Sequence, residues 1–169
     1  MIRFAFILKA AACVLGCLAT VGCGSKPVGK LPDPTDSRLK TLGSAYALAT
    51  DNLGHAPRSK EDLLQGLKTL KENLQAAAED AEGEKADKAQ VTWEPADILR
   101  SANDNEEFVV IYGVDYHDYN VSRTPRDLPV IAHEKTGKEG KRYVLQIRYV
   151  RLVPDEDFPN LKFPPGYRP

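Results

Sequence analysis

The sequence has no cysteine after residue 23: Cys13, Cys17 and Cys23 all lie in its first segment. A small secreted domain that depends on disulfides carries an even set of cysteines in its body. We therefore expect residues 24–169 to fold without disulfide bonds. Cys23, which stands just before a Gly/Ser/Lys/Pro stretch, needs another explanation.

An excess of positive charge is also missing. The 23 Lys and Arg residues are balanced by 24 Asp and Glu residues, which gives a net charge of −1. Proteins that bind nucleic acid through its phosphates carry a basic patch or stripe, and adhesion to anionic lipids needs a polybasic segment. We therefore expect no nucleic-acid partner and no membrane adhesion through overall charge.

Recurrent catalytic motifs are absent as well. The sequence contains no Gly-x-Ser-x-Gly turn, no Walker-type glycine loop and no His-Glu-x-x-His helix. These motifs place a nucleophile, a phosphate cradle or a pair of zinc ligands at a fixed spacing. We predict a protein that is not an enzyme and that needs no cofactor.

The sequence also lacks a long uninterrupted apolar run. Arg3 and Lys9 come early, and 13 uncharged residues follow at positions 10–22. A membrane-spanning helix needs about 20 apolar residues, whereas a charged start followed by a shorter apolar run is typical of a secretory signal peptide. The alternative is an uncleaved anchor helix over residues 4–23, which would require the Lys9 ammonium to reach the membrane interface.

The residues up to Cys23 resemble the lipobox of bacterial lipoprotein signal peptides: Thr20, Val21, Gly22 and Cys23. The resemblance implies that a diacylglycerol is attached to Cys23 through a thioether, that the bond after Gly22 is cleaved, and that the new amine is acylated. The four residues that end at Cys17 also fit the pattern, but cleavage there would leave an apolar stub on the mature chain. We therefore predict Cys23 as the lipidation site and residues 1–22 as the signal peptide.

The lipobox resemblance also implies a location. A lipidated Cys23 would hold the protein on a membrane of the cell envelope, with its folded domain facing the periplasm. Gly24 follows the cysteine where an inner-membrane retention signal more often has Asp, which favours the outer membrane. Removing Arg3 and Lys9 with the signal peptide leaves 21 of the 23 basic residues against 24 acidic ones, a net charge of −3.

Composition divides the remaining chain into three parts. Residues 23–35 are rich in Gly and Pro and predict a lipidated tether. Residues 36–153 carry the periodic patterns of a folded domain. Residues 154–169 hold five prolines in sixteen positions, which excludes this segment from a β-ladder and predicts a Pro-rich tail.

Two amphipathic helices are predicted in the first half of the domain. The first begins at Asp36 or Ser37, ends before Gly54, and has apolar residues at spacings of 3, 4, 3 and 4: Leu39, Leu42, Tyr46, Ala49 and Leu53. The second begins after Ser59, a residue suited to capping the free amides of a first turn. Its apolar stripe is Leu63, Leu67, Leu70 and Leu74, so the two helices are expected to form a hairpin. Residues 79–90 are interpreted as a frayed helix end or a linker.

The second half of the domain has β-strand patterns. Residues 108–114 form a continuous apolar run that predicts a strand covered on both faces. Residues 129–134 and 142–153 predict two further strands around the turn KTGKEGK, with a bulge or the end of the sheet near Val150. The fold class predicted is α+β: a helical hairpin packed on a small antiparallel sheet of about three strands.

Residues 38–57, RLKTLGSAYALATDNLGHAP, resemble the stretch that follows the membrane helix in pseudopilin-like proteins. In that family a Leu-Lys-x-Leu/Ile-Gly-x-Ala pattern leads through a polar helix to Gly-x-x-Pro. The resemblance implies a helical lead-in followed by a small antiparallel sheet. This sequence has a lipobox where that family has its prepilin cleavage signature, so the resemblance implies shared ancestry of the domain rather than a role in a pilus-like polymer.

Three side chains are candidates for a metal site. Asp115 and His117 are two residues apart and would share a face of a strand, and His133 comes from another predicted strand. Two imidazoles and a carboxylate suit a transition metal. The alternative is that residues 118–120 form a turn and that both histidines are ordinary surface or half-buried residues. His55 is interpreted as a residue at a helix C-terminus.

Two other groups are candidates for partner binding. A basic group surrounds the predicted turn after residue 134 and could contact phosphates or anionic glycans: Lys135, Lys138, Lys141 and Arg142. The alternative is a solvated turn that blocks edge-to-edge aggregation. Aromatic residues of the tail could dock on a partner, or could pack back over the domain: Phe158, Phe163 and Tyr167.

Two functions follow from these observations. The preferred hypothesis is a lipid-anchored envelope protein that acts as a non-catalytic interaction module for an unidentified envelope partner. The alternative is a lipoprotein that binds a metal or small ligand through His117 and His133.

Overall fold

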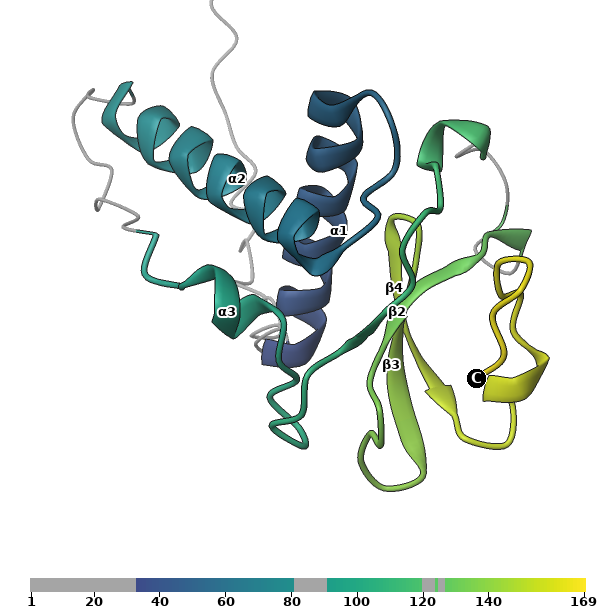
Figure 1. Ribbon diagram of the computed structural model, residues 1–169. Helices are drawn as coiled ribbons and strands as arrows, with labels where there is room; N and C mark the ends of the chain where they lie inside the picture. The colour runs from purple at the N-terminus through teal and green to yellow at the C-terminus, as the bar shows by residue number, and fades with distance from the viewer. Residues whose placement is uncertain (1–32, 81–90, 120–123, 125–126) are drawn as a thin grey trace, which may run out of the picture. The chain divides into compact units, whose positions relative to one another are not determined.

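A computed structural model describes residues 33–80, 91–119, 124 and 127–169 of the chain. These residues belong to one compact unit, Pro32–Pro169. Helices α1, α2 and α3 come first, and a four-stranded antiparallel sheet and the C-terminal tail follow (Figure 1). The α+β class is therefore confirmed, and the sheet has four strands rather than about three.

Helix α1 spans Pro34–Leu53 and starts earlier than predicted. Asp33 caps it by accepting a hydrogen bond from the Thr35 amide at 2.8 Å, and Pro34 occupies the first helical position, where its missing N–H is not needed. The predicted start at Asp36 or Ser37 was therefore wrong by two to three residues. The C-terminal prediction is confirmed, because Gly54 closes the helix in the left-handed conformation, with φ of 70°.

Helix α2 spans Lys60–Asp80 and packs against α1. The Ser59 hydroxyl accepts a hydrogen bond from the Asp62 amide at 3.3 Å, which confirms the predicted cap. Leu63 and Leu67 are fully buried, but Leu74 is 43 % exposed, so the apolar stripe is covered only along the first turns. Most of the segment 79–90, interpreted as a frayed end or linker, lies outside the described residues.

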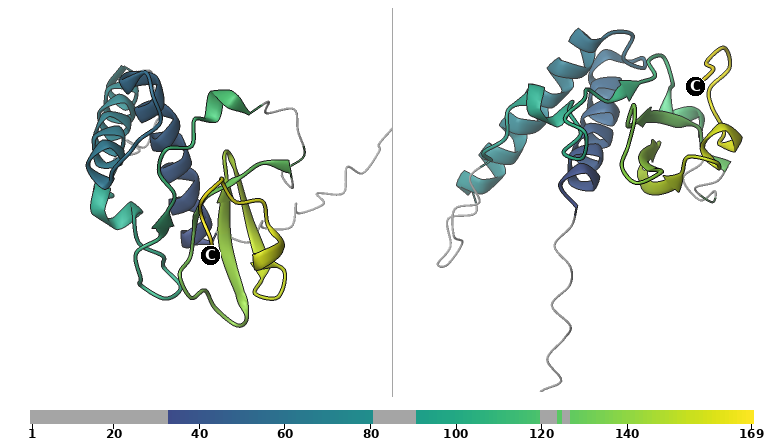
Figure 2. Two further views of the ribbon diagram at one scale, coloured as in Figure 1. Left: turned by 45° about the vertical axis from the view of Figure 1, so that its right-hand side comes forward. Right: turned by 90° about the horizontal axis from the view of Figure 1, so that it is seen from below.

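Glycine sets how closely the two helices approach each other. A Cβ atom at Gly66 in α2 would stand only 2.5 Å from the carbonyl oxygen of Ala45 in α1 and 2.8 Å from the Ala49 Cβ. On its other side α1 contacts the sheet, where a Cβ at Gly43 would stand 3.2 Å from a methyl group of Leu145. Helix α1 is thus the central element, with α2 on one side and the sheet on the other (Figure 2).

The sheet has the order β1-β2-β3-β4, with every neighbouring pair antiparallel. Strand β2, Val130–His133, is buried at all four positions. It joins β3, Lys141–Gln146, through the predicted turn, in which Gly137 and Gly140 have positive φ. These positions fit the expectation of a strand at 129–134 and a glycine-rich turn after it.

The first predicted strand, at residues 108–114, is much shorter than expected. Only Val109–Val110 form β1, paired with His133 and Ala132. Gly113 then takes a positive φ of 80° and its amide donates to the Pro57 carbonyl at 2.8 Å. The chain therefore leaves the sheet towards the connection between the helices, although its apolar side chains Phe108, Ile111 and Val114 remain buried.

The prediction of a single strand at residues 142–153 was also wrong. It is a hairpin of β3 and β4, Tyr149–Pro154, with Gln146 paired to Tyr149 across a two-residue turn of Ile147 and Arg148. Ile147 has φ of 55°, a conformation that β-branched residues rarely adopt. The same side chain is 2 % exposed, so its burial in the core offsets the backbone strain.

A buried carboxylate ties the loop before β1 to the sheet. Glu134 is fully buried and accepts hydrogen bonds from the Ser101 hydroxyl at 2.5 Å, the Asn103 amide at 3.0 Å and the Tyr143 backbone N–H at 2.7 Å. The short helix α3, Pro95–Ile98, precedes this loop and was not predicted. It contributes Ile98 to the core. Its four residues are too few to show a helical period in the sequence.

Candidate binding cleft

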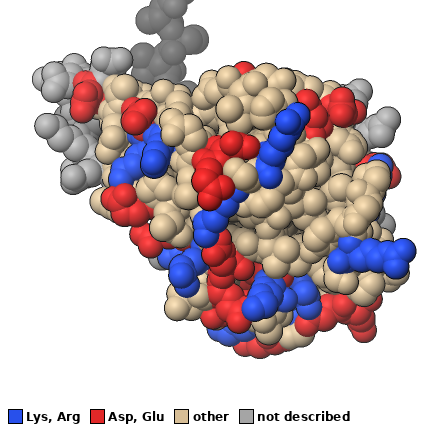
Figure 3. Space-filling model, viewed as in Figure 1, with Lys and Arg blue, Asp and Glu red and all other residues tan. Residues whose placement is uncertain are grey.

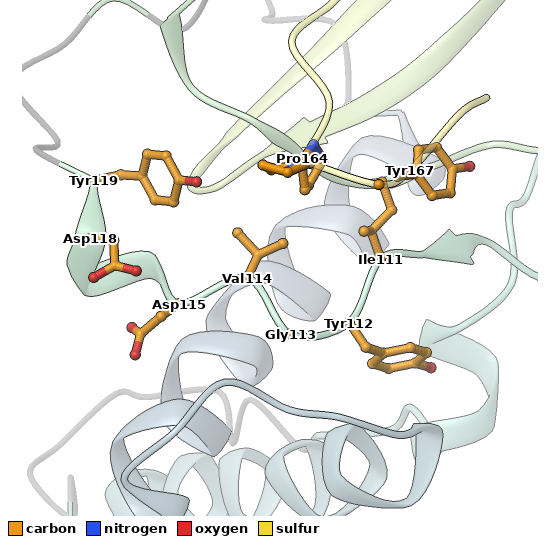
Figure 4. Close-up of a pocket in the computed structure, with 11 residues that line it drawn as sticks. Ile111, Tyr112, Gly113, Val114, Asp115, Asp118, Tyr119, Pro164 and Tyr167 are labelled. Carbon is orange, nitrogen blue, oxygen red and sulfur yellow. The ribbon is translucent and has the colours of Figure 1, made fainter.

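A cleft of about 370 Å³ lies between the segment that follows β1 and the C-terminal tail (Figure 4). Residues 111–115, 118 and 119 form its first wall, and residues 164–167 form the second. The lining includes three tyrosines and two carboxylates, and none of the lining residues is Lys, Arg or His: Tyr112, Tyr119, Tyr167, Asp115 and Asp118. In Figure 4 the Tyr119 ring points towards Pro164, so side chains from the two walls face each other.

The first wall is fixed by a tyrosine of α1. The Tyr46 hydroxyl donates to the Ile111 carbonyl at 3.3 Å and accepts from the Val114 amide at 3.1 Å. Tyr46 is 1 % exposed, and this burial raises the pKa of its phenol to about 12. The hydroxyl thus links the Ile111 carbonyl and the Val114 amide, which fixes the path of the chain between them.

The end of the first wall is a 3₁₀ turn, Tyr116–Asp118, which is held against the last turns of α1. Asp115 caps this turn by accepting from the His117 amide at 2.9 Å. One carboxylate oxygen of Asp51 accepts from the Tyr116 hydroxyl at 2.5 Å and lies 3.1 Å from Nε2 of His117. The hydrogen bond to Asp51 and burial raise the pKa of Tyr116. The Arg148 guanidinium stands over the Tyr116 ring, 5.4 Å from its centre.

The second wall is held by the buried imidazole of His133. Its Nδ1 donates to the Glu134 carbonyl at 2.7 Å, so Nε2 accepts from the Tyr167 hydroxyl at 2.8 Å. Burial lowers the pKa of His133, and the nearby positive charge of Arg142 lowers it further. The Val130 amide also donates to the Lys162 carbonyl at 2.9 Å, which fastens the tail to the start of β2.

Aromatic packing completes the attachment of the tail. Phe158 is 5 % exposed and its ring stands edge-on to His133 at 4.8 Å, with the Arg142 guanidinium over the ring at 4.3 Å. Phe163 and Tyr167 are half-buried and pack against the same core. Of the two alternatives for these aromatic residues, the structure has the tail packed back over its own domain. Phe158, Phe163 and Tyr167 are thus used within the chain, and residues 154–169 belong to the compact unit.

The structure does not bring the predicted metal ligands together. His117 lies beside Asp51 at the end of α1, whereas both ring nitrogens of His133 are engaged by Glu134 and Tyr167. Asp115 uses a carboxylate oxygen to cap the Tyr116–Asp118 turn. Within the described residues, no three His, Cys, Asp or Glu side chains are close enough to hold a metal ion. A site built from Asp115, His117 and His133 is therefore not formed.

The predicted basic group is divided between two environments. Arg142 donates to the Asp155 carboxylate at 2.7 Å and to the Lys135 carbonyl at 3.2 Å. Lys135 approaches Glu106 at 3.5 Å. Lys138 and Lys141 are exposed at the turn, where their backbones form a bridge. Arg142 therefore stabilises the fold, which leaves a smaller basic surface than the sequence predicts.

The sequence analysis did not identify the cleft as a site. Asp115 was named for a metal site, and Tyr167 for a tail that docks on a partner or packs back over the domain. Tyr46 was identified only as part of the apolar stripe of the first helix. No local pattern shows that Tyr119 and Pro164 face each other, because the two walls are about 50 residues apart in the sequence. The predicted lipidation site, Cys23, lies outside the described residues.

Comparisons with known proteins give no relative: no protein-family model, no curated protein and no solved structure matches the chain. Among the described residues, no helix has the length and apolar character needed to cross a membrane.

Proposed function

We propose that this chain is a lipid-anchored protein of a bacterial cell envelope, and that its α+β domain is a non-catalytic interaction module. The observation that carries the proposal is the sequence around Cys23: a charged start, an apolar segment, a lipobox-like Thr-Val-Gly-Cys and a Gly/Pro-rich tether. Two acyl chains already anchor a protein stably, because each buried methylene contributes about 0.8 kcal/mol. Gly24 favours the outer membrane, with the domain in the periplasm.

The cleft supports a binding role for the domain. Its walls are fixed by Tyr46 on one side and by His133 on the other, so little ordering is required when a partner binds. Tyrosine side chains are enriched at protein interfaces because each offers a large ring and a polar tip. The resemblance of residues 38–57 to pseudopilin-like proteins is compatible with such a module.

The chemistry near the cleft favours binding over catalysis. The pair formed by His117 and Asp51 resembles half of a general-base arrangement, but its side chains are 59 % and 51 % exposed. Catalytic pairs depend on burial and close partners that shift their pKa values towards neutrality. Asp51 is moreover occupied by the Tyr116 hydroxyl, which gives it a structural role in holding the wall.

Lipidation is tested by growing cells with a radioactive fatty acid and measuring the mass and label of the purified protein. Cys23→Ser should remove the label and leave residues 1–22 attached, because the thiolate is the nucleophile that receives the diacylglycerol. Cys17→Ser is the matched control and should keep label, mass and membrane fractionation. Full-length mass without label in the wild type would instead indicate an uncleaved anchor helix and would overturn the proposal.

A further inference from the structure

We infer that the open edge of strand β4 pairs with β4 of a second copy of this chain, so that the sheets of the two copies join across a twofold axis. The inference goes beyond the proposed function, because it concerns the sheet edge and not the cleft, and it does not depend on lipidation. It is carried by the backbone groups of β4, by the way the opposite edge is covered, and by the order of side chains along the strand.

Strand β4 is the last strand of the sheet, and its outward backbone groups are open. The Asp155 amide donates to the Gly140 carbonyl at 2.9 Å. Because bonded pairs alternate along antiparallel strands, the amides and carbonyls of Val150 and Leu152 turn away from β3. Among the described residues, none is hydrogen-bonded to these outward groups. A row of such groups is a template for pairing with another strand.

The opposite edge of the same sheet is covered by the chain itself. Strand β1 has only two residues, and both pair with β2. Beyond β1, the Ile111 amide donates to the Ile131 carbonyl at 2.8 Å. The Val130 amide then donates to the Lys162 carbonyl of the tail at 2.9 Å. Strand β2 thus has neighbours on both sides, whereas β4 pairs with β3 alone in the part of the chain that the structure describes.

Strand β4 has few of the features that keep edge strands apart. Lysines, bulges and short length commonly block such pairing. This strand runs for six residues in an unbroken register with β3 and contains no lysine. Its proline, Pro154, is its last residue, and Leu152 is 49 % exposed. The edge is therefore long enough and apolar enough to accept another strand.

Charge does not indicate a different kind of partner. On the face seen in Figure 3, acidic and basic side chains lie beside one another rather than in patches of one sign. Strand β4 itself has one charged residue, Arg151, whose guanidinium donates to the Gln146 side chain at 2.9 Å. Backbone pairing and apolar contact therefore decide what this edge accepts. A second copy supplies both, because in a twofold dimer each copy presents the same surface to the other.

The order of side chains along β4 fits a strand paired with its own copy. On a twofold axis, one residue of an antiparallel pair lies opposite itself. With Leu152 on the axis, each Leu152 amide donates to the Leu152 carbonyl of the second copy. The Val150 amide then reaches the Pro154 carbonyl of the second copy, so the missing N–H of the proline is not needed. The two exposed leucines cover each other on one face of the joined sheet.

Two other registers are less favourable. With Arg151 on the axis, two guanidinium groups would lie directly opposite each other, and like charges in that position are destabilising. With Val150 on the axis, Leu152 would lie opposite Arg148, which belongs to the turn between β3 and β4 and has no extended backbone to offer. The side chains of β4 therefore select the register centred on Leu152.

Cross-linking tests the contact at the axis. Full-length Leu152→Cys, purified in detergent, is treated with a short bis-maleimide and run on a denaturing gel. Directly opposite Cα atoms would lie about 5.5 Å apart, so a covalent dimer should form. Leu74→Cys is the matched control, because Leu74 is 43 % exposed on α2, and it should stay monomeric. Wild type treated in parallel reports any reaction of the cysteines in residues 1–23. A Leu152→Cys dimer band no stronger than that of wild type or of Leu74→Cys would overturn the inference.

Sedimentation equilibrium in a density-matched detergent measures the association itself. Wild type should show a reversible equilibrium between monomer and dimer. Leu152→Lys places two ammonium groups at the axis and should raise the dissociation constant about tenfold or more, which corresponds to about 1.4 kcal/mol. Leu74→Lys should leave the constant unchanged, and an unchanged thermal midpoint of Leu152→Lys would show that its fold is intact; if that midpoint falls, the cross-linking result decides. An edge that accepts only a strand of a different protein would leave the purified wild type monomeric, and that result would refute the pairing of two copies.

Discussion

The packing of α1 between α2 and the sheet makes a sharp prediction about two glycines. Gly66 lies in α2 against α1, and Gly43 lies in α1 against the sheet. Both are in helix interiors, where replacing Gly by Ala stabilises an isolated helix by about 1 kcal/mol. If helix propensity alone decided the outcome, both Gly→Ala variants would be more stable than the wild type by that amount.

The structure predicts opposite results for the two variants. The new Cβ at position 66 would stand 2.5 Å from the Ala45 carbonyl oxygen and 2.8 Å from the Ala49 Cβ, and neither atom can move without moving α1. Overpacking of this kind costs about 1–3 kcal/mol, and a clash with backbone belongs at the upper end. After the gain in propensity, we expect Gly66→Ala to lower the free energy of unfolding by about 2 kcal/mol.

Gly43→Ala is the matched control. Its new Cβ would stand 3.2 Å and 3.4 Å from the two terminal methyl groups of Leu145, which can turn aside by rotation about side-chain bonds. We therefore expect a variant that is as stable as the wild type or more stable by up to about 1 kcal/mol.

Urea denaturation followed by circular dichroism measures both effects. With a slope of about 1–3 kcal/mol per M for a protein of this size, Gly66→Ala should lower the urea midpoint by about 1 M. The Gly43→Ala midpoint should be unchanged or higher. Equal stabilisation by both substitutions would refute the close approach of α1 and α2, because propensity would then be the only effect left.

Three further predictions use the same measurement. Folding lowers the pKa of His133 below its ordinary value of 6.5, so the unfolded chain binds the proton more readily and the free energy of unfolding should fall as the pH drops below about 6.5. His133→Gln should flatten this fall between about pH 7.5 and about pH 5.5. An unchanged slope of stability against pH would contradict the burial of the imidazole. Glu134→Gln should destabilise the domain by about 1–3 kcal/mol, because its new NH₂ group would face other hydrogen-bond donors. Those donors are Ser101 and Asn103 on one side and the Tyr143 backbone amide on the other. A urea midpoint equal to that of the wild type would mean that these hydrogen bonds are not formed. Ser59→Ala should cost about 1 kcal/mol through loss of the α2 cap, whereas Ser44→Ala, at an exposed mid-helix position, should be neutral or slightly stabilising.

The sequence by itself determined the elements that depend on neighbours in the chain. Gly54 ends α1 because it adopts a positive φ without strain, and Ser59 begins α2 because its hydroxyl reaches an amide three residues later. The buried stripe of α1 follows from the 3.6-residue period, and the turn after β2 follows from its glycines. Each of these features is decided within a few residues, so its signal is present in the local sequence.

Tertiary structure alone decided the β3–β4 turn and the cleft. Neither Ile147 nor Arg148 is one of the Asn, Asp or Gly residues that normally mark a two-residue turn. The turn forms there because the Ile147 side chain is buried against the core and Arg148 lies over the Tyr116 ring. In the same way, Tyr46 and His133 place residues 111–119 opposite the tail. These contacts join residues far apart in the chain, and their free energy outweighs local preference, so no local pattern reveals them.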